Sequence, residues 1–112
     1  MRVEIRIRNT DLANALQNFV ALRLGTDLGR FADHVGRVLV KVSGLSGPQG
    51  GTKRRCLMSV QLKPSLRVVV QETDLDLYAA IDRAAARVGR LVGQRIEREQ
   101  ALRFETQMAP AA

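Results

Sequence analysis

The sequence has no tryptophan, a single cysteine and a single histidine, and each shortage removes a class of function. The lone cysteine, Cys56, cannot form an internal disulfide, which agrees with a reducing compartment. With His34 as the only histidine, neither a zinc site nor a catalytic Cys-His pair has its usual side chains. We interpret Cys56 as a small core residue and His34 as a surface or capping residue.

Aromatic residues make up only 4% of the chain, and long apolar runs are also missing. Without more rings, the chain lacks the stacking platform on which many RNA-binding domains hold single-stranded bases. No run approaches the ~18 apolar residues of a membrane span. The N-terminal MRVEIRIR alternates charged with apolar residues, unlike a signal peptide, so we expect a cytoplasmic protein.

Positive charge is what the sequence has in excess. Lysines and arginines number 18 against 11 acids, which gives a net charge of +7 and a pI near 11.0. With 112 residues, 46% of them hydrophobic, the chain suits one domain with a modest core. The charge favours an anionic partner, which leaves RNA, DNA and acidic membrane surfaces as candidates.

The period of the apolar residues predicts the element order β-α-β-β-β-α. Alternation of apolar and polar residues predicts four strands, at residues 2–8, 37–43, 56–63 and 66–72. The resulting fold class is α+β, a four-stranded sheet with two helices packed on one face.

Helical spacing predicts the two helices. The first begins at Leu12 with Thr10 as its cap, and it bends or ends near Gly25 because glycine costs about 1 kcal/mol inside a helix. The second covers residues 74–98, and Thr73 with Asp76 resembles a capping box at its start.

Composition predicts the connections and the domain boundary. Residues 44–53 are rich in glycine, so we expect a flexible loop between strands. Residues 1–100 form the domain, and residues 101–112 are read as a fraying helix end and a mobile tail because the apolar period is lost there.

Arginines gather on one edge of the second helix. Arg83, Arg87, Arg90 and Arg98 are spaced so that all four share one exposed stripe opposite the apolar face. The open sheet face is also basic, but short strands need polar outer faces in any case. We interpret that face as solvated surface, and its predicted charged residues are Arg2, Glu4, Arg6, Arg8, Arg37, Lys41, Lys63 and Arg67.

These features carry a family resemblance. The element order, the opening MRVEIRIRN, the segment ALQNFVALRL and above all DLYAAIDRAAARVGRLV resemble the ribosome hibernation-promoting factor family, also called ribosome-associated inhibitor A. The resemblance spans roughly residues 1–98 and is to the short forms of the family. It implies a cytoplasmic, non-enzymatic protein that binds the small ribosomal subunit.

The resemblance also implies a place on the ribosome and a set of contact residues. Family members lodge between the head and body of the small subunit, contact rRNA near the decoding centre, and block the mRNA and tRNA sites under stress. Basic residues of both helices make these contacts in the family. Arg23 and Arg30 match basic places of the first helix, and Arg87 and Arg90 match those of the second.

Two departures from the family pattern add further candidates. Gly93, Gln94 and Ile96 occupy places that are often basic or polar, and Arg95 and Arg98 supply charge instead. The loop at residues 44–53 is longer and more glycine-rich than the short family turn, and basic residues follow it. The predicted RNA-binding residues are Arg23, Arg30, Lys53, Arg54, Arg55, Arg83, Arg87, Arg90, Arg95 and Arg98.

Two other functions stay open from the sequence. The same charges would serve a binding module for other structured RNA or for DNA. A protein-interaction domain is the second alternative, with the open sheet face or the small-residue edge Ala86, Gly89 and Gly93 meeting a partner chain. We expect no cofactor, metal, small-molecule substrate or membrane partner.

Overall fold

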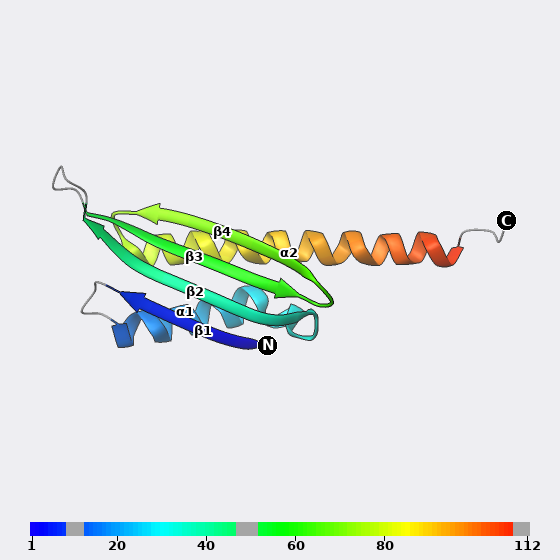
Figure 1. Cartoon of the computed structure of the whole chain (residues 1–112), viewed down its shortest axis with the longest axis horizontal. Coiled ribbons are helices and arrows are strands. Elements are labelled where there is room, and N and C mark those ends of the chain that lie inside the picture. Colours follow the sequence, from blue (N-terminus) through cyan, green and yellow to red (C-terminus); the bar gives the residue numbers. More distant parts are fainter. Residues whose placement is uncertain (9–12, 47–51, 109–112) are drawn as a thin grey trace.

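The computed structural model of the chain describes residues 1–8, 13–46 and 52–108, and its elements follow the predicted order (Figure 1). The strands are β1 (Arg2–Arg8), β2 (Val35–Ser46), β3 (Thr52–Leu62) and β4 (Leu66–Asp74). The helices are α1 (Ala13–Leu28), the short 3-10 helix η1 (Gly29–His34) and α2 (Leu77–Met108). The predicted α+β fold is confirmed.

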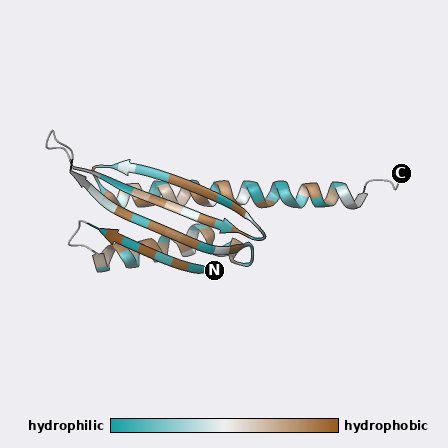
Figure 2. Cartoon of the chain, in the orientation of Figure 1, coloured by the Kyte–Doolittle hydropathy of each residue, from teal (hydrophilic) through white to brown (hydrophobic). Residues whose placement is uncertain are grey.

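The four strands form one sheet in the order β1-β2-β3-β4. Strand β1 pairs with β2 in parallel, because α1 carries the chain back between them, and the other two pairs are antiparallel. Hydropathy alternates along the strands, as Figure 2 shows. Both helices lie behind the sheet in Figure 1, so within the described part of the chain the other sheet face is open.

The core lies between the sheet and the two helices. Helix α1 buries Leu16, Val20, Leu24 and Leu28, which recur every fourth residue and so share one face. Each such side chain stabilises the fold by about 1.5–3 kcal/mol relative to an exposed one. The buried residues of α2 are Leu77, Ala80, Ile81, Ala84, Ala85, Val88, Val92 and Ile96.

Helix α1 does not end near Gly25, which was one of the two predicted outcomes. It continues to Leu28, and the 3-10 helix η1 follows from Gly29. Gly25 costs about 1 kcal/mol of helix propensity. The buried side chains of Leu24 and Leu28 on either side outweigh that cost.

The strands flanking the glycine-rich segment are longer than predicted. β2 and β3 continue their ladder through Gly44↔Arg54 to Ser46↔Thr52. Composition alone indicated a loop over residues 44–53, but cross-strand pairing extends the sheet into both ends of it. Residues 47–51 of the predicted loop lie outside the described residues.

The ends of α2 also differ from the prediction. Asp76 alone caps its start: the Tyr78 backbone N–H donates to Asp76 Oδ1 at 3.0 Å, whereas Thr73 belongs to β4. The helix runs on to Met108, beyond the end of the sheet (Figure 1). The proposed cap Thr10 and the tail residues 109–112 lie outside the described residues.

Two apolar residues on the core-facing side of the edge strands are exposed. Val3 is 42% exposed and Leu66 is 37% exposed. Both stand near the start of an edge strand, β1 or β4, where less of the helical layer covers them.

Candidate nucleic-acid interface

Helix α2 lies close to α1 and to η1 because two residues of α2 lack side chains. A Cβ atom at Gly89 would lie 2.8 Å from the Asp27 carbonyl oxygen, and one at Gly93 would lie 3.0 Å from Cζ of the Phe31 ring. Both glycines are buried. The small-residue edge that the sequence offered to a partner chain is therefore filled, at these two positions, by residues of this chain.

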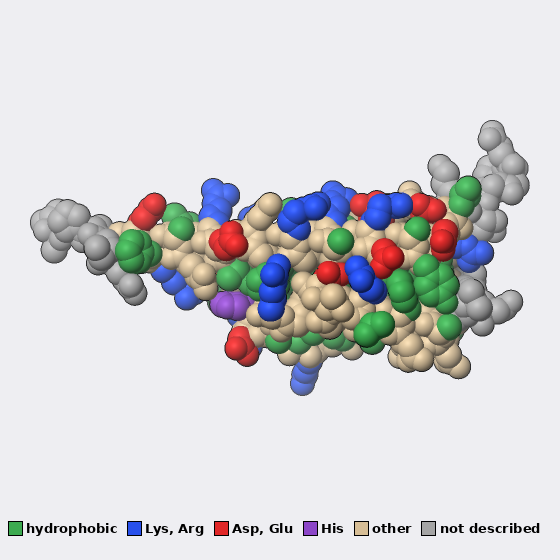
Figure 3. Space-filling view, turned by 180° about the vertical axis from the view of Figure 1, so that it is seen from behind, with side chains coloured by type: hydrophobic (Ala, Val, Ile, Leu, Met, Phe, Trp, Pro, Cys, Tyr) green, Lys and Arg blue, Asp and Glu red, His purple; other side chains and the backbone are tan. Residues whose placement is uncertain are grey.

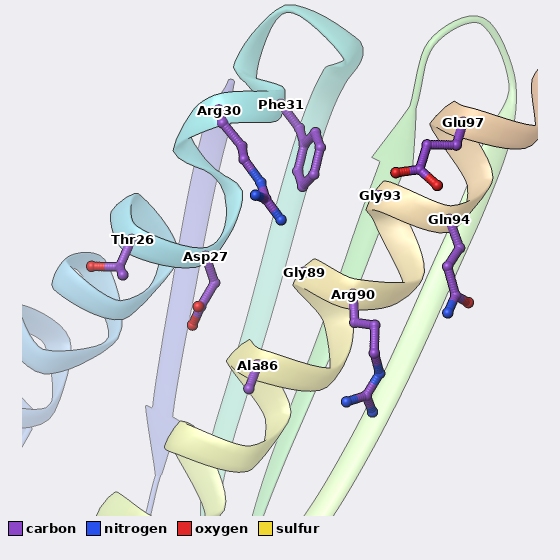
Figure 4. Close-up of a pocket in the computed structure, with 10 residues that line it drawn as sticks. All are labelled: Thr26, Asp27, Arg30, Phe31, Ala86, Gly89, Arg90, Gly93, Gln94 and Glu97. Atoms are coloured by element: carbon purple, nitrogen blue, oxygen red, sulfur yellow. The ribbon is translucent and has the colours of Figure 1, made fainter. Parts of the chain in front are cut away.

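A groove runs along this helix contact on the side away from the sheet. Its volume is about 610 Å³. Figure 4 shows Arg30 and Phe31 reaching from η1 toward α2, with Arg90 and Gln94 projecting from α2 beside it. The remaining lining residues are Thr26, Asp27, Ala86, Gly89, Gly93 and Glu97.

Two of the arginines predicted to bind RNA, Arg30 and Arg90, line this groove, and both remain available to a ligand. The Arg30 guanidinium carbon lies 4.7 Å from the centroid of the Phe31 ring, a cation–π contact that orients the side chain and leaves its N–H groups free to donate. Arg90 is exposed. The groove is thus lined by one cation from η1 and one from α2, 60 residues apart in the sequence, together with the acids Asp27 and Glu97.

Arg23, which was also predicted to bind RNA, is held in ion pairs within the protein. Its Nε lies 2.8 Å from Asp82 Oδ1 on α2, and its Nη2 lies 3.5 Å from Asp27 Oδ2. Its side chain is 31% exposed. Arg23 therefore links α1 to α2, and its charge is balanced by two carboxylates.

The first two arginines of the α2 stripe are paired with β4. Arg83 Nη1 donates to Asp74 Oδ2 at 2.8 Å, and its Nη2 donates to the Thr73 carbonyl oxygen at 2.9 Å. Arg87 Nη1 lies 3.3 Å from Glu72 Oε1. Both side chains stay about half exposed, at 49% and 47%.

These pairs shift the ionisation of Asp74. The Asp76 backbone N–H and the Arg83 guanidinium both donate to the Asp74 carboxylate and lower its pKa below the ordinary 3.8. The same pairing raises the pKa of Arg83. Arg83 therefore fastens the start of α2 to the end of β4, besides presenting charge to solvent.

The later arginines of α2 differ from the first two. Arg90, Arg95 and Arg98 are exposed, and none of them has an ion-pair partner within the described residues. Free guanidinium groups bind phosphate well because their N–H groups match its oxygens. The predicted stripe thus divides into a paired half beside β4, Arg83 and Arg87, and an unpaired half, Arg90 and Arg98; farther along α2, Arg103 pairs with Glu99 at 3.6 Å.

The basic triplet after the glycine-rich segment lies apart from the groove. Arg54 pairs in register with Asp74, at the end of the sheet where α2 begins, whereas the groove lies near η1. Arg54 and Arg55 are both half-buried, and the Lys53 side chain is not among those described. The structure therefore does not bring the triplet together with Arg30 and Arg90.

Chemistry at the single cysteine is suppressed by the fold. Cys56 is buried in the core, and burial, with a smaller effect of Glu72, raises the pKa of its thiol to about 12. Within residues 1–8, 13–46 and 52–108, no three histidine, cysteine, aspartate or glutamate side chains cluster so as to hold a metal ion. No helix in the same part of the chain is long and apolar enough to cross a membrane.

Comparison with known proteins identifies relatives of the whole domain. The model of the family described as sigma 54 modulation protein / S30EA ribosomal protein matches residues 3–100. The structure of the Thermus thermophilus protein Y N-terminal domain is 33% identical, with a TM-score of 0.63, and the match covers 84% of this chain and 98% of that one. No curated protein matches the chain.

A second solved structure is similar in fold. The ribosomal subunit interface protein from Coxiella burnetii matches with a TM-score of 0.68, and the match covers 87% of this chain and 99% of that one. Its sequence identity of 15% makes this a likeness of fold alone. The β-α-β-β-β-α arrangement is thus shared across very different sequences.

Proposed function

The chain belongs to the sigma 54 modulation protein / S30EA ribosomal protein family, the hibernation-promoting factors that its sequence resembles, and from this premise we propose that it is a ribosome-associated subunit-interface factor. It binds the small subunit through rRNA, in the channel used by mRNA and tRNA, and keeps idle ribosomes from translating. The observation that carries the proposal is the family match over residues 3–100.

The helix face supports an RNA-binding role for this chain. Arg30 and Arg90 flank a groove on that face, and Arg95 and Arg98 extend the unpaired charge along α2. Arginines in such positions bind the sugar-phosphate backbone and position the protein without reading the base sequence. The scarcity of aromatic residues fits recognition by phosphate contacts and RNA shape.

The ion pairs of the structure rank the candidate residues. Arg30, Arg90, Arg95 and Arg98 have no carboxylate partner within the described residues, so phosphate can bind them without displacing one. Arg83 and Arg87 must share their N–H groups with Glu72 or Asp74. We expect them to contribute less, and Arg23 less still. The basic triplet Lys53, Arg54 and Arg55 is not part of the groove lining, so we expect any contact that it makes with RNA to lie outside the groove.

Sedimentation with separated ribosomal subunits tests the proposal. The protein should co-migrate with the small subunit at low salt, and an excess of free duplex RNA should not displace it. Replacing both Arg87 and Arg90 by glutamate should abolish co-migration, mainly through Arg90, and leave the fold intact, because both side chains are exposed and Arg87 loses only a half-exposed ion pair with Glu72. Co-migration with the large subunit only, or displacement by any duplex RNA, contradicts a small-subunit factor.

A further inference from the structure

The open face of the sheet carries a concentrated positive charge. Its residues alternate along the strands with the buried core residues, so their side chains point away from the helices. One acid, Glu4, is among them, and it lies 3.3 Å from Arg6 and 3.5 Å from Arg37. The strand cations of the face are Arg2, Arg6, Arg8, Arg37, Lys41, Arg55 and Arg67; Arg55 was not in the predicted set, and the predicted Lys63 follows the end of β3 instead of lying in a strand.

The helix-covered side of the molecule carries equal numbers of positive and negative side chains among the described residues. Figure 3 shows basic and acidic side chains interleaved there. Among the described residues this side has nine arginines and nine acids. The arginines are Arg23, Arg30, Arg54, Arg83, Arg87, Arg90, Arg95, Arg98 and Arg103, and the acids are Asp27, Asp33, Glu72, Asp74, Asp76, Asp82, Glu97, Glu99 and Glu105.

The excess charge of the chain therefore sits on the open sheet face. Seven cations against Glu4 leave six positive charges there, and the remainder of the net +7 comes from Lys63, which follows β3, and from Lys53 and Asp11, whose side chains are not described. A polyanion that approaches this protein is attracted most strongly toward the sheet, at the opposite side from the groove. Prediction from the arginine stripe alone placed this attraction on α2.

Strand register sets the spacing of these cations. Arg2 stands beside Arg37, and Arg6 stands beside Lys41, in the parallel pair of β1 and β2. Neighbouring strands lie about 4.8 Å apart, and residues on one face repeat about every 6.8 Å along a strand. Arg67 of β4 extends the positive charge across the sheet. A shallow hollow of about 190 Å³ lies on this face, and Glu4 and Arg67 are among its lining residues.

We propose that the open face of the sheet binds RNA backbone, so that the protein holds RNA on both of its sides. This inference rests on the proposed function and extends it, because the two faces would contact different rRNA segments of one channel. The closely spaced cations complement a chain of phosphates, each of which releases counterions when it binds.

Other occupants fit the face less well. A second copy of this chain would bring six positive charges against six, which repel each other. The described aromatic residues, Phe19, Phe31, Tyr78 and Phe104, lie on the helices, so the face lacks the ring anchors of protein–protein interfaces. It lacks a stacking surface for bases for the same reason, which leaves backbone contacts.

The test uses charge reversal at two cations of the face. Lys41 and Arg67 are exposed, and neither has an ion-pair partner in the described residues. We expect the double variant Lys41→Glu with Arg67→Glu to bind the small subunit at least about tenfold more weakly. The slope of log affinity against log salt concentration should become shallower by about 1.5, which corresponds to the loss of two phosphate contacts. The glutamine pair, Lys41→Gln with Arg67→Gln, should give the same direction with a smaller loss.

Matched variants separate a specific contact from a general loss of charge. Arg67→Glu and Arg103→Glu change the same residue type by the same charge, and Arg103, whose one ion pair is an exposed contact with Glu99 at 3.6 Å, lies on α2 beyond the groove. We expect Arg67→Glu to weaken binding and Arg103→Glu to change it less than about twofold, as an exposed charge outside the contact does. Equal effects of the two would overturn the inference.

A second measurement keeps the inference separate from the proposed function. A free RNA duplex is added to the isotope-labelled protein, and amide chemical shifts are followed by NMR. Shifts at open-face positions of β1, β2 and β4 support the inference even where small-subunit binding fails. Shifts confined to α2 and η1 would overturn the inference. So would small-subunit binding that survives RNase treatment, or a dimer of the protein, measured by sedimentation, that the open-face substitutions abolish.

Discussion

Arg83 Nη1 and Asp74 Oδ2 lie 2.8 Å apart and join the start of α2 to the end of β4. Arg90 stands two turns farther along the same helix and has no such partner in the described part of the chain. Residues that look alike in the arginine stripe therefore differ in role. The first fastens the helix to the sheet, and the second is open to phosphate.

Acid should weaken the contact between α2 and β4. The pKa of Asp74 is lowered in the folded protein, so its carboxylate stabilises the fold above its unfolded pKa, and this stabilisation is lost as pH falls through the folded value. We expect the melting temperature of the wild type to fall more steeply below about pH 3.8 than that of Asp74→Asn. Circular dichroism melts across pH check this, and parallel curves contradict it.

Replacing Arg83 should affect stability more than RNA binding, whereas replacing Arg90 should do the reverse. Arg83→Gln loses the contacts with Asp74 and the Thr73 carbonyl oxygen, so its melting temperature should fall. Arg90→Gln should melt like the wild type and bind the small subunit more weakly, by about three- to tenfold for one phosphate contact. Paired melting and sedimentation measurements test this, and identical behaviour of the two variants refutes the division of the stripe.

The glycines of the helices should respond to alanine in opposite directions. Gly25→Ala meets no atom within 4 Å and should stabilise the protein by about 0.5–1 kcal/mol through helix propensity. Gly89→Ala would place its Cβ 2.8 Å from the Asp27 backbone oxygen, so α1 must move and the protein should lose stability. Urea denaturation measures both changes. A stabilised Gly89→Ala variant would show that α1 and α2 are not closely packed there.

Gly93→Ala provides an intermediate case. Its Cβ would meet the end of the Phe31 ring at 3.0 Å, and a side chain can swing where backbone cannot. The ring would turn toward the groove and disturb its contact with Arg30. We expect a smaller loss of stability than in Gly89→Ala and a measurable loss of RNA affinity. If Gly93→Ala bound RNA with the affinity of the wild type, the groove would have no part in RNA binding.

Cys56 should be unreactive until the protein unfolds. Its thiol is buried in the core and its pKa is raised to about 12, so almost no thiolate is present at pH 8. A disulfide reagent should label one thiol per chain in denaturant and none in the native protein within the same time. Rapid native labelling would contradict a Cys56 packed beneath α2.

Much of this fold is predictable from the sequence because its core follows simple periods. Alternation in RVLVKVS gives the buried Val38, Val40 and Val42, and helical spacing gives the buried stripe of α2. Errors fall where tertiary packing outweighs composition. Burial of Leu28 carries α1 through Gly25, and cross-strand pairing draws Gly44 into β2.

The candidate site is less predictable because charge balance depends on partners distant in the sequence. Glu72 and Asp74 meet Arg83 and Arg87 only because β4 and α2 lie side by side in the folded chain. Helical spacing reports which arginines share an edge of α2, but it does not report which carboxylates of β4 face that edge. Likewise, strand alternation predicts a basic open face, but only the folded structure shows that the arginines of the other side are balanced by its carboxylates.

Binding of the wild-type protein to small subunits across a salt series tests the central claim most directly, namely that the protein binds rRNA through phosphate contacts. If about five to seven phosphates are neutralised, the plot of log affinity against log salt concentration should be linear with a slope of about −4 to −6. A slope near zero, with binding retained at high salt, would contradict the account and indicate an apolar or protein-mediated contact.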